Sequence, residues 1–345
     1  MSKVRIAVIG AGMFGQRHLA YLRREPACEI AAIADPSAAA AAYAATEGLR
    51  HFADYRAMLE EVKPDGAIIA SPNALHVPMG LACAERNVHM LVEKPLADTV
   101  AAARELSTAA ERAGVALLVG HHRRHNPMLE KARELVQGGA IGKLTAVAAF
   151  WLIRKPDDYF NVAWRREQGG GPILINLIHD IDDLRFVCGE IDRVQAMVSN
   201  AVRGFPVEDT AAIALRFASG ALGTVTLSDA VPAPWSWELT TGESPLYPQR
   251  AENCYLFAGT MGSLSVPALE LWRYHGEQSW SASLDRERIE VAAEDPLTRQ
   301  LRHFARVIRG EEAPRITGAD ATRTLAATLA VSEAAASGRV VALRT

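Results

Sequence analysis

A glycine-rich turn near the start of the chain sets the first constraint on its fold. The apolar run Val4–Ile9 has the length of a buried β-strand, and a helical pattern follows it after Gly10-Ala11-Gly12-Met13-Phe14-Gly15. In a strand–turn–helix setting, the first glycine permits a tight turn, the second lets backbone amides approach a pyrophosphate, and the third lets the helix pack on the sheet. The helix N-terminus adds partial positive charge. This pattern predicts a dinucleotide-binding turn formed by Gly10, Gly12, Met13, Phe14 and Gly15, the alternative being a glycine turn without a ligand.

An acidic residue, Asp35, follows the second apolar run, Glu29–Ala34. At the end of that strand a carboxylate can accept hydrogen bonds from the adenosine ribose hydroxyls. The same charge would repel a 2′-phosphate, so the sequence favours NAD over NADP. Capping of the helix after Pro36 is the simpler alternative, and the two roles can coexist.

Short apolar runs alternate with helical patterns over the first part of the chain, which is typical of repeated βαβ units and a parallel sheet covered on both faces. The expected strands are Val4–Ile9, Glu29–Ala34, Gly66–Ala70, Val88–Val92 and Val115–Val119. The expected helices include Ser37–Glu47 and Thr99–Ala113, the latter with an N-cap at Asp98 or Thr99 and a C-cap at Gly114. We predict a doubly wound Rossmann domain over residues 1–121.

The pattern changes after Gly120, where a polar cluster, His121–Pro127, precedes a helix that ends near Gly138. Further strands are expected at Leu144–Ile153, Ala211–Phe217, Ala221–Leu227 and Trp235–Thr241, and helices at Pro172–Val187, Pro296–Arg309 and Ala319–Ala336. This order predicts an α+β domain over residues 122–345 with an open, predominantly antiparallel sheet. An open sheet leaves one face uncovered, so a homodimer or homotetramer is expected.

The composition excludes several other classes of protein. The chain has 345 residues, a formal net charge of −3 and four scattered cysteines. Such a charge gives no electrostatic footprint for nucleic acid, the cysteines form no zinc or disulfide pattern, and no apolar run is long enough for a membrane span. His121, His122 and His125 lack metal-ligand spacing and adjoin two arginines, so no metal is expected. A cytoplasmic protein is the default expectation.

Two other groups of residues suggest chemistry. Glu93-Lys94-Pro95 follows the fourth expected strand, at the carboxyl end where open α/β sheets bind ligands. Later, Asn176, His179 and Asp182 recur every three residues, broadly on one face of the expected helix. Each group alone is compatible with a solvated surface or a buried structural histidine.

Taken together, these residues resemble the glucose-fructose oxidoreductase / inositol dehydrogenase / MocA family of NAD(P)-dependent oxidoreductases. The resemblance covers nearly the whole chain and is carried by the glycine turn, Ser71-Pro72-Asn73 with His76, Glu93-Lys94-Pro95, Arg124 with Asn126-Pro127, Trp164-Arg165, Gly169–Pro172 leading to His179 and Asp182, and Gly259–Ser263. It implies that Lys94 and His179 are catalytic. It also implies that the cofactor is contacted by Ser71, Asn73, His76, Glu93, Lys94, Trp164 and Arg165, and the substrate by Lys94, His122, Arg124, Asn176 and His179.

The sequence departs from the family pattern at one place. The family's inositol dehydrogenases carry an aspartate four residues before the catalytic histidine, where this chain has Ile175, with Asn176 beside it. The expected reaction is hydride transfer between nicotinamide and a secondary alcohol or carbonyl of a sugar, cyclic polyol or related compound, with His179 as acid/base and Lys94 stabilising the alkoxide. An NAD-dependent glycoside-cleaving enzyme and a non-catalytic dinucleotide or sugar sensor are the alternatives.

Overall fold

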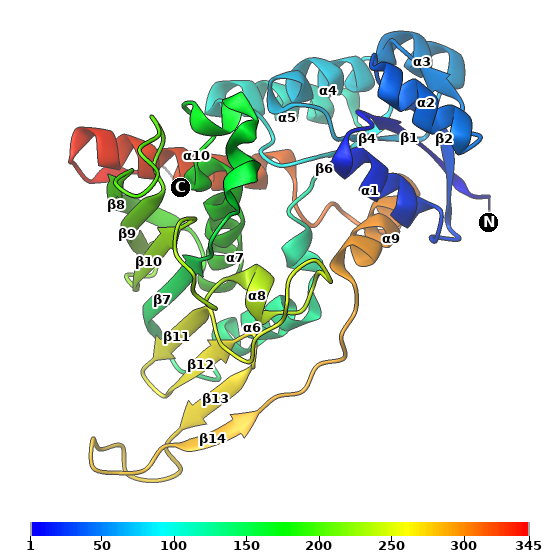
Figure 1. Ribbon diagram of the computed structural model, residues 1–345. Coiled ribbons are helices and arrows are strands. Elements are labelled where there is room, and N and C mark those ends of the chain that lie inside the picture. Colours follow the sequence, from blue (N-terminus) through cyan, green and yellow to red (C-terminus); the bar gives the residue numbers. More distant parts are fainter. Residues whose placement is uncertain (1, 344–345) are drawn as a thin grey trace. The chain divides into compact units, whose positions relative to one another are not determined.

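The computed structural model describes residues 2–343 and contains two compact units (Figure 1). The first comprises the chain up to His122 together with Pro296–Leu325, and the second comprises Arg123–Asp295 and the residues from Ala326 onward. The predicted division at residue 121 places Pro296–Leu325 in the second domain. In the structure this segment joins the first unit because the Phe304 ring packs against Gly66, and Val119 N donates to Ile316 O at 3.1 Å.

The first unit is a Rossmann fold, as predicted. Its strands are β1 (Val4–Ile9), β2 (Cys28–Ala34), β3 (His51–Phe52), β4 (Gly66–Ile69), β5 (His89–Val92) and β6 (Leu117–Val119). They form one parallel sheet in the order β3-β2-β1-β4-β5-β6. Its helices are α1 (Met13–Leu22), α2 (Ala38–Thr46), α3 (Tyr55–Val62), α4 (His76–Ala84), α5 (Val100–Ala113) and α9 (Pro296–Ile308). The strand order reverses between β1 and β4, which is where such sheets bind nucleotides.

Local capping explains where the helices of this unit begin and end. The Thr99 side chain accepts a hydrogen bond from Ala102 N at 3.2 Å, so Thr99 rather than Asp98 is the N-cap of α5. Gly114 ends the same helix with φ of +67°, a conformation that favours glycine. Ser37 caps α2 through Ala40 N, which leaves Asp35 outside the helix.

The second unit contains a nine-stranded sheet in the order β14-β13-β12-β11-β7-β10-β9-β8-β15. Its strands are β7 (Leu144–Leu152), β8 (Ile191–Ser199), β9 (Thr210–Phe217), β10 (Leu222–Ser228), β11 (Tyr255–Gly259), β12 (Gly262–Val266), β13 (Glu270–Arg273), β14 (Asp285–Arg288) and β15 (Val341–Ala342). Within this sheet, among its described strands, only β7 and β10 pair in parallel, and the other pairings are antiparallel. The predicted, predominantly antiparallel sheet is therefore confirmed.

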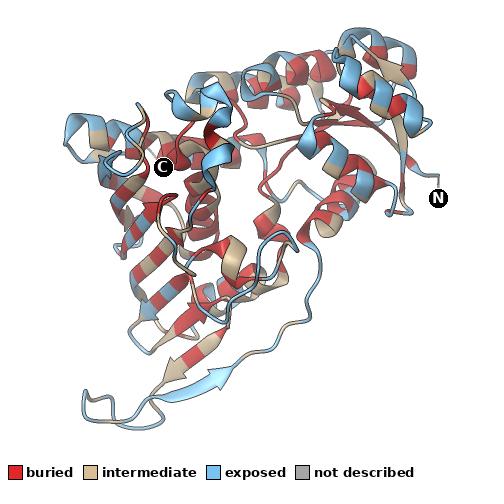
Figure 2. Ribbon diagram, in the orientation of Figure 1, coloured by how far each residue is buried: buried red, intermediate tan, exposed pale blue. Residues whose placement is uncertain are grey.

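Helices cover one face of this sheet. The core joins inward side chains of the strands to α6 (Pro127–Gln137), α7 (Ile178–Cys188) and the later part of α10 (Gly318–Ser337). Along β8, β9 and β10 buried and exposed residues alternate, which Figure 2 shows as stripes across the strands. The second face consequently exposes small and apolar side chains such as Ala212, Ala214 and Leu222.

Two predicted elements of the second unit need correction. The expected strand Trp235–Thr241 is wrong: a short helix, α8 (Trp237–Thr240), begins after Ser236, whose side chain accepts from Leu239 N. The alternation of apolar and polar residues there imitates a strand, but Trp237 is buried in the domain and stacks on Tyr255. The expected helix Pro172–Val187 instead begins with a π-helical turn, Ile173–Leu177, before α7.

No helix within residues 2–343 combines the length and apolar character needed to cross a membrane.

Candidate active site

The glycine turn has the geometry of a phosphate cradle. Gly10 adopts φ of +90°, and a Cβ there would lie 2.7 Å from Ala70 O at the end of β4. A Cβ on Gly15 would lie 1.9 Å from Gly10 O, so α1 can pack this closely only with glycine at that position. In contrast, a Cβ on Gly12 would meet no atom within 4 Å. The turn is tight on its protein side and open at Gly12, where α1 begins without a side-chain cap.

Asp35 lies beside this turn. Its carboxylate accepts hydrogen bonds from Ala11 N and from Ser37 N, both at 2.8 Å. Partial burial works to raise the pKa of Asp35, but the hydrogen bonds from Ala11 and Ser37 outweigh it and the pKa is lowered. The side chain is thus an ionised acceptor that also holds the glycine turn in place, and it remains partly exposed.

Glu93 forms a buried pair with a residue that the sequence did not suggest. His18, on α1, places Nε2 2.7 Å from Glu93 Oε1, and both side chains are largely buried. Burial tends to raise the pKa of Glu93, but the hydrogen bond and charge of His18, with the charges of Lys94 and His122, lower it to about 2. The Glu93 carboxylate therefore joins α1 to the end of β5, directly before Lys94.

His76 connects the two loops that the sequence motifs identified. Its Nδ1 lies 2.8 Å from Pro95 O and its Nε2 lies 2.9 Å from Ser71 O. The ring is buried at the start of α4, whereas Asn73 is exposed in the preceding turn. His76 therefore fixes the loop after β4 to the loop that carries Lys94.

In the second unit, the π-helical turn sets the positions of Asn176 and His179. Both residues are partly exposed, but Asp182, which the spacing placed on their face, is buried. Glu208 stabilises the start of the turn, because its Oε1 accepts from Ile173 N at 3.0 Å. Asn176 Oδ1 accepts a hydrogen bond from Lys155 Nζ at 2.8 Å. A π-helical turn adds one residue per hydrogen-bonded ring, and such turns are frequent at functional sites.

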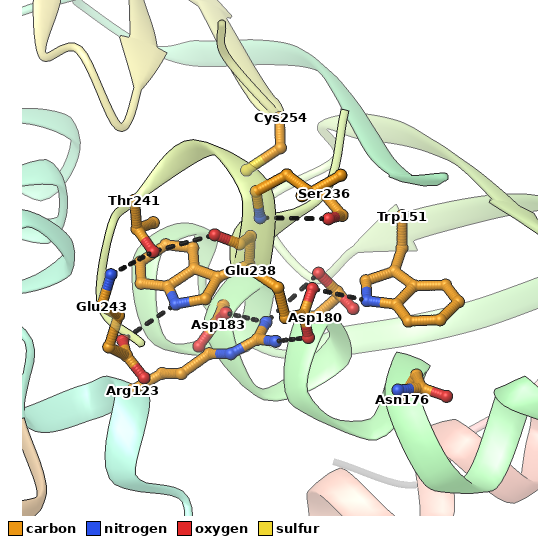
Figure 3. A network of polar contacts seen from close by, with 12 residues as sticks. Arg123, Trp151, Asn176, Asp180, Asp183, Ser236, Glu238, Thr241, Glu243 and Cys254 are labelled. Atoms are coloured by element: carbon orange, nitrogen blue, oxygen red, sulfur yellow. Dashed lines mark hydrogen bonds and ion pairs between the residues drawn. The ribbon is translucent and has the colours of Figure 1, made fainter. Parts of the chain in front are cut away.

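The acids that follow His179 hold two buried arginines. Arg124 forms a bidentate ion pair with Asp182: Nε donates to Oδ2 at 2.7 Å and Nη2 donates to Oδ1 at 2.6 Å. This arginine therefore has a carboxylate partner inside the domain. Arg123 reaches Asp183 at 3.1 Å and Glu238 at 2.9 Å, and it also approaches Asp180 (Figure 3).

Too few positive charges face the acids of the Arg123 network for all of them to be ionised. Burial raises the pKa of Asp180 to about 6 and that of Asp183 well above its ordinary value, although Arg123 opposes both shifts. Tyr255 Oη also donates into this pair of carboxyls. The network joins α7, on which His179 lies, to Arg123 and to Tyr255 of β11.

The remaining predicted contacts lie in separate places. Trp164 is about half exposed, and Arg165 stacks over Tyr159 at 3.9 Å and donates to Tyr159 O at 2.7 Å. His122 is half-buried at the end of the first unit's opening segment. Among the residues that the structure describes, no group of three or more His, Cys, Asp or Glu side chains is arranged to hold a metal ion.

The fold and the glycine turn define a class of protein, the NAD-binding Rossmann oxidoreductases that carry a second α+β domain. Residues 4–121 match the family model described as "Oxidoreductase family, NAD-binding Rossmann fold", and residues 129–265 match the C-terminal domain of the same GFO/IDH/MocA family. The chain belongs to this family.

Individual relatives agree with this assignment. The chain is 31% identical to the rhizopine catabolism protein MocA of Rhizobium meliloti over 239 residues, which are 67% of this chain and 73% of that protein. It is 28% identical to 1,5-anhydro-D-fructose reductase of Ensifer adhaerens over 99% of both chains. Its fold is similar to the WlbA dehydrogenase of Bordetella pertussis, solved with NADH and UDP-GlcNAcA, with a TM-score of 0.82, 23% identity and full coverage of both chains.

Proposed function

We propose that this protein uses NAD to interconvert a secondary alcohol and a carbonyl on a sugar, a cyclic polyol or a related hydroxy compound. The observation that carries the proposal is the fixed position of Lys94 at the end of β5, between the His18–Glu93 pair and the His76–Pro95 contact, in the same unit as the glycine turn. The substrate class is supported by relatives named 1,5-anhydro-D-fructose reductase, myo-inositol 2-dehydrogenase and D-glucoside 3-dehydrogenase.

We assign a separate role in this reaction to each group of residues. The turn at Gly10–Gly15 and Asp35 would hold NAD, which supplies the hydride acceptor when bound. We assign to His179 the removal of the hydroxyl proton, because an imidazole titrates near working pH. We assign to the Lys94 ammonium the stabilisation of the alkoxide that develops on the substrate oxygen. Carbonyl reduction uses the same two groups in reverse.

The preference for NAD over NADP is also a proposal, and it rests on Asp35. The lowered pKa of this carboxyl keeps it negative at neutral pH, so it accepts hydrogen bonds from ribose hydroxyls and repels a 2′-phosphate. Asp35→Asn removes the carboxylate charge. The variant should therefore show a smaller difference between its affinities for NADH and NADPH than the wild type does.

A fluorescence titration with NADH and then NADPH tests the cofactor assignment. Micromolar affinity for NADH, about −8 kcal/mol, with clearly weaker NADPH binding supports it. Oxidation of myo-inositol, D-apiose, levoglucosan and methyl glucosides, and reduction of 1,5-anhydro-D-fructose, followed by nicotinamide absorbance, then tests the reaction. Glycoside cleavage without net NADH formation would contradict the proposed reaction while leaving the cofactor assignment intact.

A further inference from the structure

Lys155 is a buried lysine just beyond β7 with an unusual set of neighbours. Its side chain is only 10% exposed. Nζ donates to Asn176 Oδ1 at 2.8 Å and lies 3.4 Å from Asp229 Oδ2. The rings of Tyr159 and Trp151 lie 4.8 and 5.5 Å from the ammonium. A buried ammonium must be paired with a negative charge or hydrogen-bonded. Here the amide oxygen of Asn176 accepts one of its hydrogen bonds.

Asp229 is shared by two buried cations at this place. Asp229 Oδ1 also accepts from Arg203 Nε at 2.9 Å, and both side chains are buried. Asp229 thus faces both Arg203 and Lys155. Arg203 also pairs with the exposed Asp157 at 3.6 Å, and the charge of Glu238 acts on Lys155 as well. Burial lowers the pKa of Lys155 while Asp229 works to raise it. The Asn176 carbonyl dipole therefore supplies part of the stabilisation that the lysine needs.

The chemistry of the two side chains fixes the orientation of the Asn176 amide. An ammonium group has donors only, so the atom of Asn176 that faces Lys155 must be the oxygen. The amide NH₂ is then turned away from Lys155, and it makes no hydrogen bond to the residues that the structure describes. Asn176 is partly exposed in the π-helical turn, one turn before His179.

We propose that Lys155 is a positioning residue that holds Asn176 as a hydrogen-bond donor, and that the substrate presents to Asn176 an oxygen that can only accept, such as a keto, carboxylate or acetal oxygen. The inference rests on the proposed function. A carboxylate at the same place would instead accept from a substrate hydroxyl, so the Lys155–Asn176 pair selects between two classes of substrate group.

A double-mutant cycle tests whether Lys155 acts through Asn176. The assay uses whichever compound named above gives the highest kcat/KM. Lys155→Met is expected to raise KM about tenfold with a smaller change in kcat, and Asn176→Ala to raise it at least as much. In the Asn176→Ala background, Lys155→Met should then leave KM unchanged within about twofold. If the double variant instead shows the product of the two single-variant increases in KM, Lys155 binds substrate directly or supports the fold generally. That result would overturn the proposal.

Matched variants separate positioning from folding. Lys155→Gln keeps an N–H donor for Asn176 Oδ1, so it should retain KM closer to the wild-type value than Lys155→Met does. Lys143→Met changes an exposed lysine of the same unit and should alter neither KM nor the melting temperature. In Lys155→Met the Arg203–Asp229 pair remains, so we expect the variant to fold.

A second measurement needs no substrate. The seven asparagines allow the side-chain NH₂ signals to be followed by NMR after selective ¹⁵N labelling, with Asn176→Ala identifying the Asn176 pair. Lys155→Met should shift or broaden this pair, and Lys143→Met should leave it unchanged. Unchanged Asn176 signals in Lys155→Met would overturn the proposed contact. Absence of NADH binding or turnover in the wild-type protein would instead count against the proposed function.

Discussion

At the residue scale, Lys94 is placed by neighbours that come from three different segments of the first unit. Glu93 ties it to α1 through His18, and His76 ties Pro95 to the loop after β4. The Glu-Lys-Pro motif and His76 were visible in the sequence as parts of a family pattern. His18 and Lys155 were not assigned, because nothing in a single sequence links residue 18 to 93 or residue 155 to 176.

Replacement of Lys94 tests its proposed chemical role. We expect Lys94→Ala to lower turnover at least about a hundredfold, since the charge that stabilises the alkoxide is removed. NADH affinity should stay nearly unchanged in the fluorescence titration. Lys3→Ala, at an exposed position of the same unit, is the control. Turnover like that of the wild type in Lys94→Ala would remove this lysine from the mechanism.

The depressed pKa of Glu93 predicts a pH dependence of stability. The folded-state pKa, about 2, lies below the ordinary value of 4.5, so the ionised carboxylate stabilises the fold above about pH 4.5 and loses this contribution as the pH falls toward 2. Thermal unfolding of the wild type and Glu93→Gln should therefore differ most near neutral pH and converge in acid. Exposed Glu85→Gln is the control, and a constant gap for Glu93→Gln would contradict the prediction.

At the element scale, the sequence predicted best where strand, turn and helix repeat. The main strands of the first sheet were located to within one or two residues, because each is an apolar run bounded by turn residues. In the second unit, β8 and β11–β14 were missed. β11 and β8 each pair on one side with a strand from a distant part of the chain, β7 and β15 respectively. β13 and β14 have few apolar residues. The π-helical turn was also missed, since its sequence is compatible with an ordinary helix.

The two glycines of the turn should respond differently to substitution. In Gly15→Ala the added methyl meets Gly10 O, so we expect a loss of stability of at least about 2 kcal/mol, measured by denaturant unfolding. In Gly12→Ala the methyl points into open space, so stability should hold. NADH affinity should nevertheless fall at least about tenfold, because the pyrophosphate needs this space. Equal NADH affinity in Gly12→Ala and the wild type would argue against this position for the cofactor.

At the scale of the whole molecule, the uncovered face of the nine-stranded sheet exposes apolar side chains that have no partner in the described structure. Leu222 and Leu256 are 60% and 43% exposed there, with small alanines between them. A sheet face that exposes small and apolar side chains suits the packing of an identical surface. We propose that the protein forms a homo-oligomer through this face.

A charge placed in the middle of that face tests the proposal. Ala214 lies on β9, between β8 and β10, and it is exposed. Ala214→Arg should convert the oligomer to monomers in light-scattering chromatography, because it would bury two like charges against each other. Ala39→Arg, at an exposed position of α2, should leave the mass of the oligomer unchanged. A monomeric wild-type protein would refute the proposed oligomer.

The return of Pro296–Leu325 to the first unit has a consequence for how such proteins can diversify. The chain passes from one unit to the other three times, at residues 122/123, 295/296 and 325/326. A gene segment that encodes one continuous stretch therefore cannot carry the whole second unit into another protein without also carrying Pro296–Leu325 of the first unit. New specificity in this architecture is expected to arise by substitution in place, at positions such as 155 and 176, rather than by exchange of whole modules.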